Sequence, residues 1–218
     1  MPYLDKRLAA FLDLVRDDTK YAMAHVFVLP APDQEFYLAT TDTFRIHVIH
    51  SRHVFFDPAL HAHLQPGAYR MACAAQGITL TLNPELRCPS ILEKIERVAT
   101  GKRLPMEQWP NINRTAAKAL AEQCVYAHFD HVSRHTLRFA CFAHAGFQKD
   151  RLKLNPCFVY DALTLPRPRV SMPLQIRLLD HEQPVRIGDD HAFAVIAPIQ
   201  PQRRVTASGQ SYKEPAHV

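Results

Sequence analysis

Glycine is scarce in this sequence, with 6 residues among 218, whereas proline reaches 17. The scarcity argues against glycine-rich loops that cradle phosphate groups, and the prolines predict many turns with a fixed backbone. No stretch of about 18 consecutive apolar residues occurs, so the sequence offers no candidate membrane span. The first residues, MPYLDKRLAAFLDLVRDD, carry acidic side chains within their apolar run and lack a signal-peptide pattern. We therefore expect a cytoplasmic protein with no membrane partner.

Cysteine pairs and catalytic motifs are also missing. The 5 cysteines are widely spaced and include no C-x-x-C pair, which argues against a disulfide framework or a thiolate zinc site. The patterns G-x-S-x-G and H-E-x-x-H do not occur. Cys157 follows a proline at an expected helix start, where the helix dipole would favour a thiolate, but its position in the helix favours a packing or surface role. We expect no enzymatic activity and no cofactor.

Histidine is plentiful, with 13 residues, and leaves a metal site as an alternative. Two groups lie close together in the sequence: His128, His131 and His135 around Asp130, and His47, His50 and His53. The first group would place three imidazoles on one helical face, as a zinc site requires. No carboxylate or cysteine pattern completes either group, so hydrogen-bonded or solvated histidines are the preferred interpretation. Whether the first group binds a metal stays open.

The composition is that of an ordinary globular chain, 47% hydrophobic and 22% charged, which suffices for one large domain or two small ones. The formal net charge is +5 and the isoelectric point is about 9.0. A moderate positive charge permits contact with nucleic acid without requiring it.

Apolar periodicity predicts an α+β chain. One expected helix spans residues 4–16. Ser90 is the expected cap of a second helix, which carries apolar positions from 91 to 98, and residues 115–124 form a third. Asn155 and Pro156 predict the start of a fourth helix, which ends before Pro166. The expected strands span residues 23–29, 36–39, 45–50, 54–56, 78–82, 137–143, 174–178, 185–187 and 193–199.

The polar, proline-punctuated stretch ATGKRLPMEQWPNINR divides this pattern into two halves of similar α+β character. We expect one domain over residues 1–100, a linker over 101–114, a second domain over 115–201, and a disordered tail over 202–218.

Residues 40–46 read TTDTFRI, residues 155–163 read NPCFVYDAL, and residues 184–187 and 194–199 read PVRI and AVIAPI. In this order the three segments resemble the bacterial sliding clamp, the β subunit of DNA polymerase III. Residues 40–46, TTDTFRI, are similar to the Ala-Thr-Asp-Gly-His-Arg-Leu segment of its middle domain. Residues 155–163, NPCFVYDAL, resemble the Asn-Pro-x-Tyr-Leu-x-Asp-Ala-Leu helix of its last domain, and residues 184–187 and 194–199 resemble its closing strands. Thr43 and Phe44 replace the Gly-His of the first motif, and Ala197 stands where methionine is common. The resemblance implies two clamp-like domains, each with helices on one face of an antiparallel sheet, in a chain shorter than the usual three-domain clamp.

The resemblance also implies a groove between the two domains that receives a short peptide from a DNA polymerase or another clamp-binding protein. In such a groove apolar residues bury partner side chains, while Arg45 and threonine hydroxyls hold the peptide backbone. The residues that would line it are Lys20, Met23, Thr41, Thr43, Phe44, Arg45, Ile46, Pro105, Val195, Ile196, Ala197, Pro198 and Ile199.

A sliding clamp encloses double-stranded DNA in a ring and meets its phosphates through loosely placed cations, without sequence specificity. The cations implied here are Lys6, Arg7, Lys94, Arg97, Lys102, Arg103 and Lys118; a plain solvated helix face is the alternative for each. Six domains per ring predict a homotrimer of this chain.

The other function left open is a clamp-derived adaptor or decoy that binds the same peptides without a ring. The short length suggests a phage or mobile-element replication protein.

Overall fold

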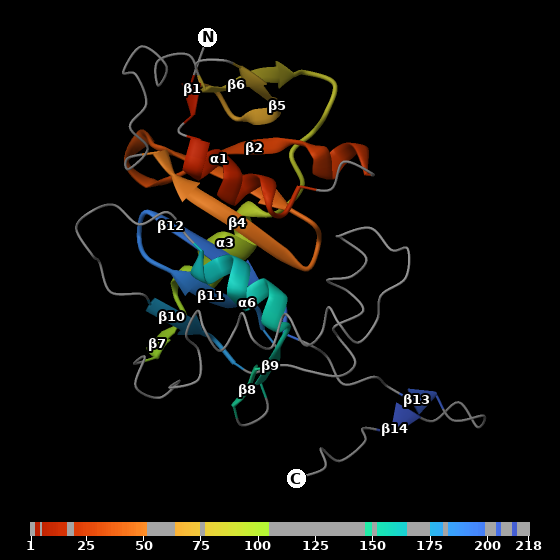
Figure 1. Ribbon diagram of the computed structural model, residues 1–218. Helices are drawn as coiled ribbons and strands as arrows, with labels where there is room; N and C mark the ends of the chain where they lie inside the picture. The colour runs from red at the N-terminus through yellow and green to blue at the C-terminus, as the bar shows by residue number, and fades with distance from the viewer. Residues whose placement is uncertain are drawn as a thin grey trace.

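The computed structural model describes residues 3–4, 6–16, 20–51, 64–74, 77–104, 147–149, 152–164, 175–180, 183–198, 204–205 and 211–212. Most of them build one antiparallel sheet of ten strands, in the order β1-β6-β5-β2-β3-β4-β12-β11-β10-β7 (Figure 1). Its strands are β1 (Tyr3–Leu4), β2 (Val26–Pro30), β3 (Phe36–Thr41), β4 (Arg45–His50), β5 (Gly67–Ala74), β6 (Gly77–Asn83), β7 (Lys102–Leu104), β10 (Gln175–Leu178), β11 (Val185–Gly188) and β12 (Ala192–Ile196). The predicted α+β fold is confirmed.

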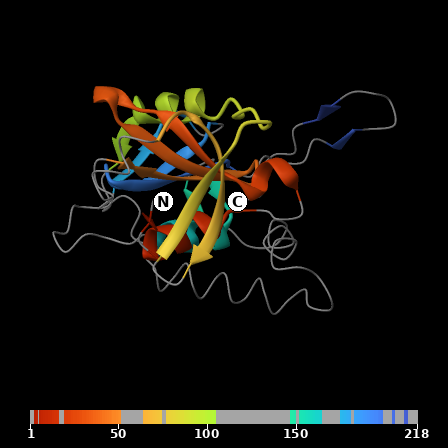
Figure 2. The same cartoon turned by 90° about the horizontal axis from the view of Figure 1, so that it is seen from above.

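Helices cover both faces of the sheet. α1 (Lys6–Asp13) packs on the face that carries Val26 and Val28, whereas α3 (Leu92–Ala99) packs on the face that carries Phe27 and Leu29. Because successive side chains of a strand point to opposite faces, α1 and α3 lie on opposite sides. α6 (Pro156–Leu163) contacts β11 and β12 on the same side as α1. Figure 2 shows α3 on one side of the sheet and the α1/α6 pair on the other.

The sheet is continuous across the two halves of the sequence. β4 pairs with β12, with Arg45 opposite Ile196 and Ile49 opposite Ala192. The core around α3 is likewise shared, since Phe193 and Val195 of β12 pack with Ile46 and Val48 of β4. The division into domains at residues 101–114 stays a prediction; within that stretch Lys102–Leu104 forms β7, which pairs with β10.

Several expected elements are confirmed. Strands occur at 36–41, 45–50, 77–83, 175–178, 185–188 and 192–196, close to their predicted positions. Asn155 caps α6 as predicted, because its side-chain oxygen accepts a hydrogen bond of 2.9 Å from the Cys157 N–H, and Pro156 is the first helical residue. The expected helix at 115–124 and the expected strands at 54–56 and 137–143 lie outside the described residues.

Other expectations were wrong at specific residues. Leu4 belongs to β1 rather than to the first helix, which ends at Asp13, and a 3-10 turn, η1 (Tyr21–Ala24), precedes β2. Ser90 does not cap α3; the cap position is Ile91, with no side-chain hydrogen bond. In the tail, β13 (Arg204–Val205) pairs with β14 (Ser211–Tyr212), so those residues are ordered strands. β5 was not anticipated, nor was the pairing of β8 (Phe147–Lys149) with β9 (Leu152–Leu154).

Candidate partner-binding site

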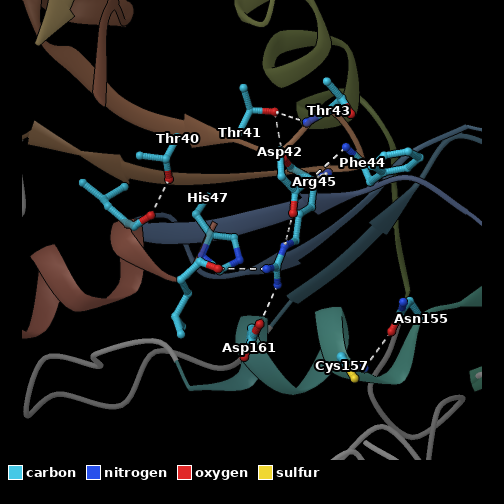
Figure 3. Close-up of polar contacts among 12 residues, drawn as sticks. Thr40, Thr41, Asp42, Thr43, Phe44, Arg45, His47, Asn155, Cys157 and Asp161 are labelled. Carbon is cyan, nitrogen blue, oxygen red and sulfur yellow. Dashed lines mark hydrogen bonds and ion pairs between the residues drawn. The ribbon is translucent and has the colours of Figure 1, made fainter. Parts of the chain in front are cut away.

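The turn between β3 and β4 is held by its own side chains. The Asp42 carboxylate accepts hydrogen bonds of 3.0 Å from the backbone N–H groups of Phe44 and Arg45. The Thr41 hydroxyl donates to the Arg45 carbonyl at 2.9 Å and accepts from the Thr43 N–H at 3.1 Å (Figure 3). Thr43 has φ of 79°, a left-handed conformation that favours glycine. The polar step in the middle of a strand pair is therefore a turn stabilised by Asp and Thr side chains.

Arg45 is the centre of a buried ion-pair cluster. Its side chain is 0% exposed; its Nε lies 2.9 Å from Asp42 Oδ2, and one terminal nitrogen lies 2.6 Å from Asp161 Oδ2. The other terminal nitrogen donates to the Leu14 carbonyl at 2.9 Å, and the guanidinium lies 4.4 Å from the Phe158 ring centroid. Figure 3 shows the Arg45 side chain reaching from its strand to Asp161 on α6. A buried charge is stable only when it is paired and hydrogen-bonded in this way.

This burial bears on the predicted role of two groove residues. Arg45 directs its hydrogen bonds inward, and the Thr41 hydroxyl is used within the turn, with Thr41 only 6% exposed. Contact of either side chain with a peptide backbone stays a prediction, and this arrangement does not favour it. Arg45 links the β3–β4 turn, the residue after α1 and the side of α6.

The end of β12 lies directly against this turn. Ile196 is opposite Arg45, and the Ala197 N–H donates a 2.8 Å hydrogen bond to the Phe44 carbonyl. Thr43 is exposed there, and Phe44 and Ala197 are half-buried, whereas the predicted groove residues Ile46, Val195, Ile196 and Pro198 are buried. The segments expected to meet thus lie side by side, and the part of them that reaches the surface is small and largely apolar.

A second surface element lies at the same end of the sheet. β2 begins at Val26 and β3 ends at Thr41 in an antiparallel pair, so η1 stands beside that end. Lys20 is exposed and Met23 half-buried, and Tyr21 is 55% exposed. A hydrogen bond that Asn83 donates to the Tyr21 hydroxyl, followed by the effect of Arg70, lowers the pKa of Tyr21 below its ordinary value. Pro105 and Ile199 lie outside the described residues.

The predicted DNA contacts are not gathered on one face. Arg7 is exposed on α1, whereas Lys94 and Arg97 are exposed on α3, across the sheet. Lys102 and Arg103 are exposed on β7, the edge strand next to β10. For Lys6 only its place in α1 is described, and Lys118 lies outside the described residues.

Three residues of the cluster were not predicted from the sequence as site residues: Asp42, Asp161 and Phe158. The position of Arg45 on an expected buried strand could have predicted carboxylate partners, because a buried charge requires pairing. Asp42 stands three residues before Arg45, but nothing in the sequence placed α6 against β4.

The histidines that the structure describes do not form a metal site. His47 is 0% exposed and its Nδ1–H donates to the Phe11 carbonyl at 2.7 Å, while His50 stacks edge-on against Tyr37. Within the described ranges no group of three His, Cys, Asp or Glu residues could hold a metal ion. His53, His128, His131 and His135 fall outside these ranges.

No helix in the described part of the chain is long and apolar enough to cross a membrane.

Together, one continuous antiparallel sheet with α1 and α6 on one face defines an α+β clamp fold. Solved structures similar to this chain include bacterial DNA polymerase III β subunits. The Helicobacter pylori β clamp bound to a DNA ligase peptide matches with a TM-score of 0.50 and 10% identity, over 91% of this chain and 65% of that chain. The same clamp in complex with diflunisal matches with a TM-score of 0.50 and 11% identity, over 91% of this chain and 66% of that chain. The Pseudomonas aeruginosa clamp matches with a lower TM-score of 0.48, at 12% identity, over 92% of this chain and 66% of that chain.

The resemblance read from the sequence is thus confirmed at the level of the fold. The chain spans 65% of the first clamp's length, just under two thirds. No family model matches the sequence, and no curated protein matches it either.

Proposed function

We propose that the chain is a sliding-clamp-like processivity factor, a non-enzymatic cytoplasmic protein that encircles double-stranded DNA and tethers a DNA polymerase or another replication protein. The observation that carries the proposal is the meeting of the Asp42–Arg45 turn with the end of β12, joined by the 2.8 Å hydrogen bond from Ala197 to Phe44. The Helicobacter pylori clamp, which shares the fold, was solved with a DNA ligase peptide bound.

The surface at this junction suits an extended peptide. Phe44 and Ala197 offer half-buried apolar surface, and Met23 offers more at the same end of the sheet. Thr43 and Lys20 are exposed around it. An apolar floor with a polar rim is the usual form of a peptide-binding groove. The buried Arg45 cluster keeps this floor in a fixed position, which lowers the entropic cost of binding.

A peptide titration tests the groove. The labelled DNA ligase peptide of the Helicobacter pylori clamp is titrated with the chain, and binding is followed by fluorescence anisotropy. We expect Phe44→Glu to weaken binding at least about tenfold, because a carboxylate in an apolar floor must be desolvated. Leu179→Glu is the matched control: Leu179 is a 39% exposed apolar residue between β10 and β11, and its replacement should leave affinity unchanged. Equal affinity of both variants and the wild type would exclude this groove.

The ring requires a homotrimer, since two clamp-like domains per chain give six only in three copies. Light scattering after gel filtration should give about three times the chain mass of 24.9 kDa. A monomer at micromolar concentration would rule out a ring closed by this chain alone.

One observation favours the second function, an adaptor or decoy that binds clamp-interacting peptides without a ring. The predicted DNA-facing cations are divided between the α1 face and the α3 face, so no single described face carries them all. Retention on DNA separates the two functions. A ring stays on closed circular DNA and leaves linear DNA through its ends, whereas an adaptor behaves the same on both.

A further inference from the structure

Three arginines lie in one row across the sheet, on the face that α3 covers. Arg103 of β7 is directly opposite Arg177 of β10, and Arg177 is directly opposite Arg186 of β11. Residues directly opposite in an antiparallel pair share a face and stand about 5 Å apart. Arg186 is opposite Val195, which packs against α3, so the row belongs to the α3 face.

The two inner arginines are anchored but not fully used. Arg186 is 7% exposed, lies with its guanidinium carbon 4.0 Å from the Phe193 ring centroid, and donates to the Asp189 carbonyl at 2.9 Å. Arg177 donates from one terminal nitrogen to the Ala99 carbonyl at the end of α3 at 2.7 Å, and from the other to the Gln175 side-chain oxygen at 3.3 Å. Within the described part of the chain, Nε of Arg177 and Nε of Arg186 are buried without a hydrogen-bond partner. Burial lowers the pKa of Arg186 below its ordinary value; the Asp190 carboxylate opposes this effect, and neighbouring Arg177 adds to it.

Negative charge near the row does not balance it. Among the described residues, the one carboxylate that contacts these arginines is Asp190, whose Oδ1 lies 3.2 Å from a terminal nitrogen of Arg186. Asp190 is half exposed, with 54% of its side chain accessible. Arg103 is exposed and makes no ion pair with a described residue. Like charges directly opposite across strands are destabilising. The carboxylates of Asp190 and Asp189 offset part of the charge of Arg186, so the row combines three cations with two nearby anions.

We propose that the row Arg103–Arg177–Arg186 binds a phosphate group. The planar guanidinium fork matches phosphate oxygens in pairs. The exposed Arg103 and the half-buried Arg177 donate to the ligand, while the buried Arg186 supplies fixed positive charge behind them. The site is on the opposite side of the sheet from α1 and α6. Phosphate binding at this site requires neither a closed ring nor the peptide groove.

A phosphate group reaches such a row either as a free anion or as part of a nucleic-acid backbone. The first source is tested with inorganic phosphate. Binding is measured as a rise in the unfolding temperature of the protein in phosphate, compared with chloride at the same ionic strength. The second is tested with a short duplex, followed by fluorescence anisotropy at several salt concentrations.

The test variant is Arg103→Gln, and Arg87→Gln is its matched control. Both residues are exposed and both changes remove one positive charge, but Arg87 lies in the segment between β6 and α3, outside the row and outside the predicted DNA contacts. We expect Arg103→Gln to weaken binding of the responding probe about fivefold or more, while Arg87→Gln leaves it near the wild-type value. For the duplex, Arg103→Gln should also reduce the salt slope by about 0.9.

A response to phosphate that Arg103→Gln removes supports a free-anion site. A response to the duplex alone that the same variant weakens supports a backbone site. Equal losses in both variants indicate diffuse charge attraction and overturn the proposal. Absence of any response to either probe overturns it as well.

Discussion

The two faces of the sheet use buried arginine in opposite ways. On the α1/α6 face, Arg45 is fully enclosed and contacts two carboxylates, a carbonyl and an aromatic ring. On the α3 face, Arg177 and Arg186 stand opposite each other, and among the described residues only Arg186 contacts a carboxylate, that of the exposed Asp190. The first arrangement satisfies its charge internally, whereas the second keeps positive charge in excess.

This difference indicates a structural role for Arg45 and a binding role for the arginine row. A buried cation that is fully paired with its own chain has no hydrogen bonds left for a partner, so Arg45 is a positioning residue for the turn that carries Phe44. A row of cations that is incompletely paired remains available to an external anion. The resemblance to clamps implied a binding role for Arg45. The register of β7, β10 and β11 instead places Arg103, Arg177 and Arg186 in one row that could bind an anion.

The largest expected effect is that of Arg45→Met. The change leaves Asp42 and Asp161 buried without their cation, and loss of one member of a buried pair costs about 3–5 kcal/mol. On the other face, Arg177→Met should cost less than about 1 kcal/mol, because loss of the hydrogen bonds to Ala99 and Gln175 is offset by relief of repulsion from the neighbouring arginines. Urea unfolding of both variants measures the difference in the free energy of unfolding. Similar losses would show that the two faces do not differ in this respect.

A smaller effect is expected from variants at the N-termini of α6 and α3, which lie on opposite faces of the sheet. Asn155→Ala removes the cap of α6 and should lower the free energy of unfolding by about 1 kcal/mol. Ser90→Ala should change it by less than about 0.5 kcal/mol, because Ser90 is exposed and makes no capping bond to α3. Thermal unfolding of the two variants provides the measurement. A larger loss for Ser90→Ala would mean that it caps α3 in solution.

The smallest expected effect is in the turn itself. Thr43→Gly removes the strain of a left-handed threonine, worth about 1–2 kcal/mol, but glycine adds freedom to the unfolded chain. The net result should be a gain of about 0.5 kcal/mol. Thr81→Gly, in the middle of β6, is the control and should lose about 1 kcal/mol, since its extended backbone holds no such strain. A loss at both positions would contradict the strain argument.

Local elements were predictable because they depend on neighbours in the sequence. The β4 strand and the Asn155 cap follow from alternation and from an Asn-Pro pair, and both are confirmed. The pairing of β4 with β12, the place of α3 across the sheet and the contact of Arg45 with Asp161 depend on residues far apart in sequence, and no local pattern fixed them. Likewise, each arginine of the row looks like an ordinary strand residue until the register of three strands is known.

The pairing of Ile49 with Ala192 has a consequence for synthesis of the chain. β4 leaves the ribosome well before β12, and at roughly 5–20 residues per second the interval is about 7 to 30 seconds. During this time the β4 edge has no partner strand, and the guanidinium of Arg45 has no Asp161. A strand that waits with an open edge is prone to pair with another nascent chain. We therefore expect slower translation to lengthen the interval in which nascent chains can associate through this edge.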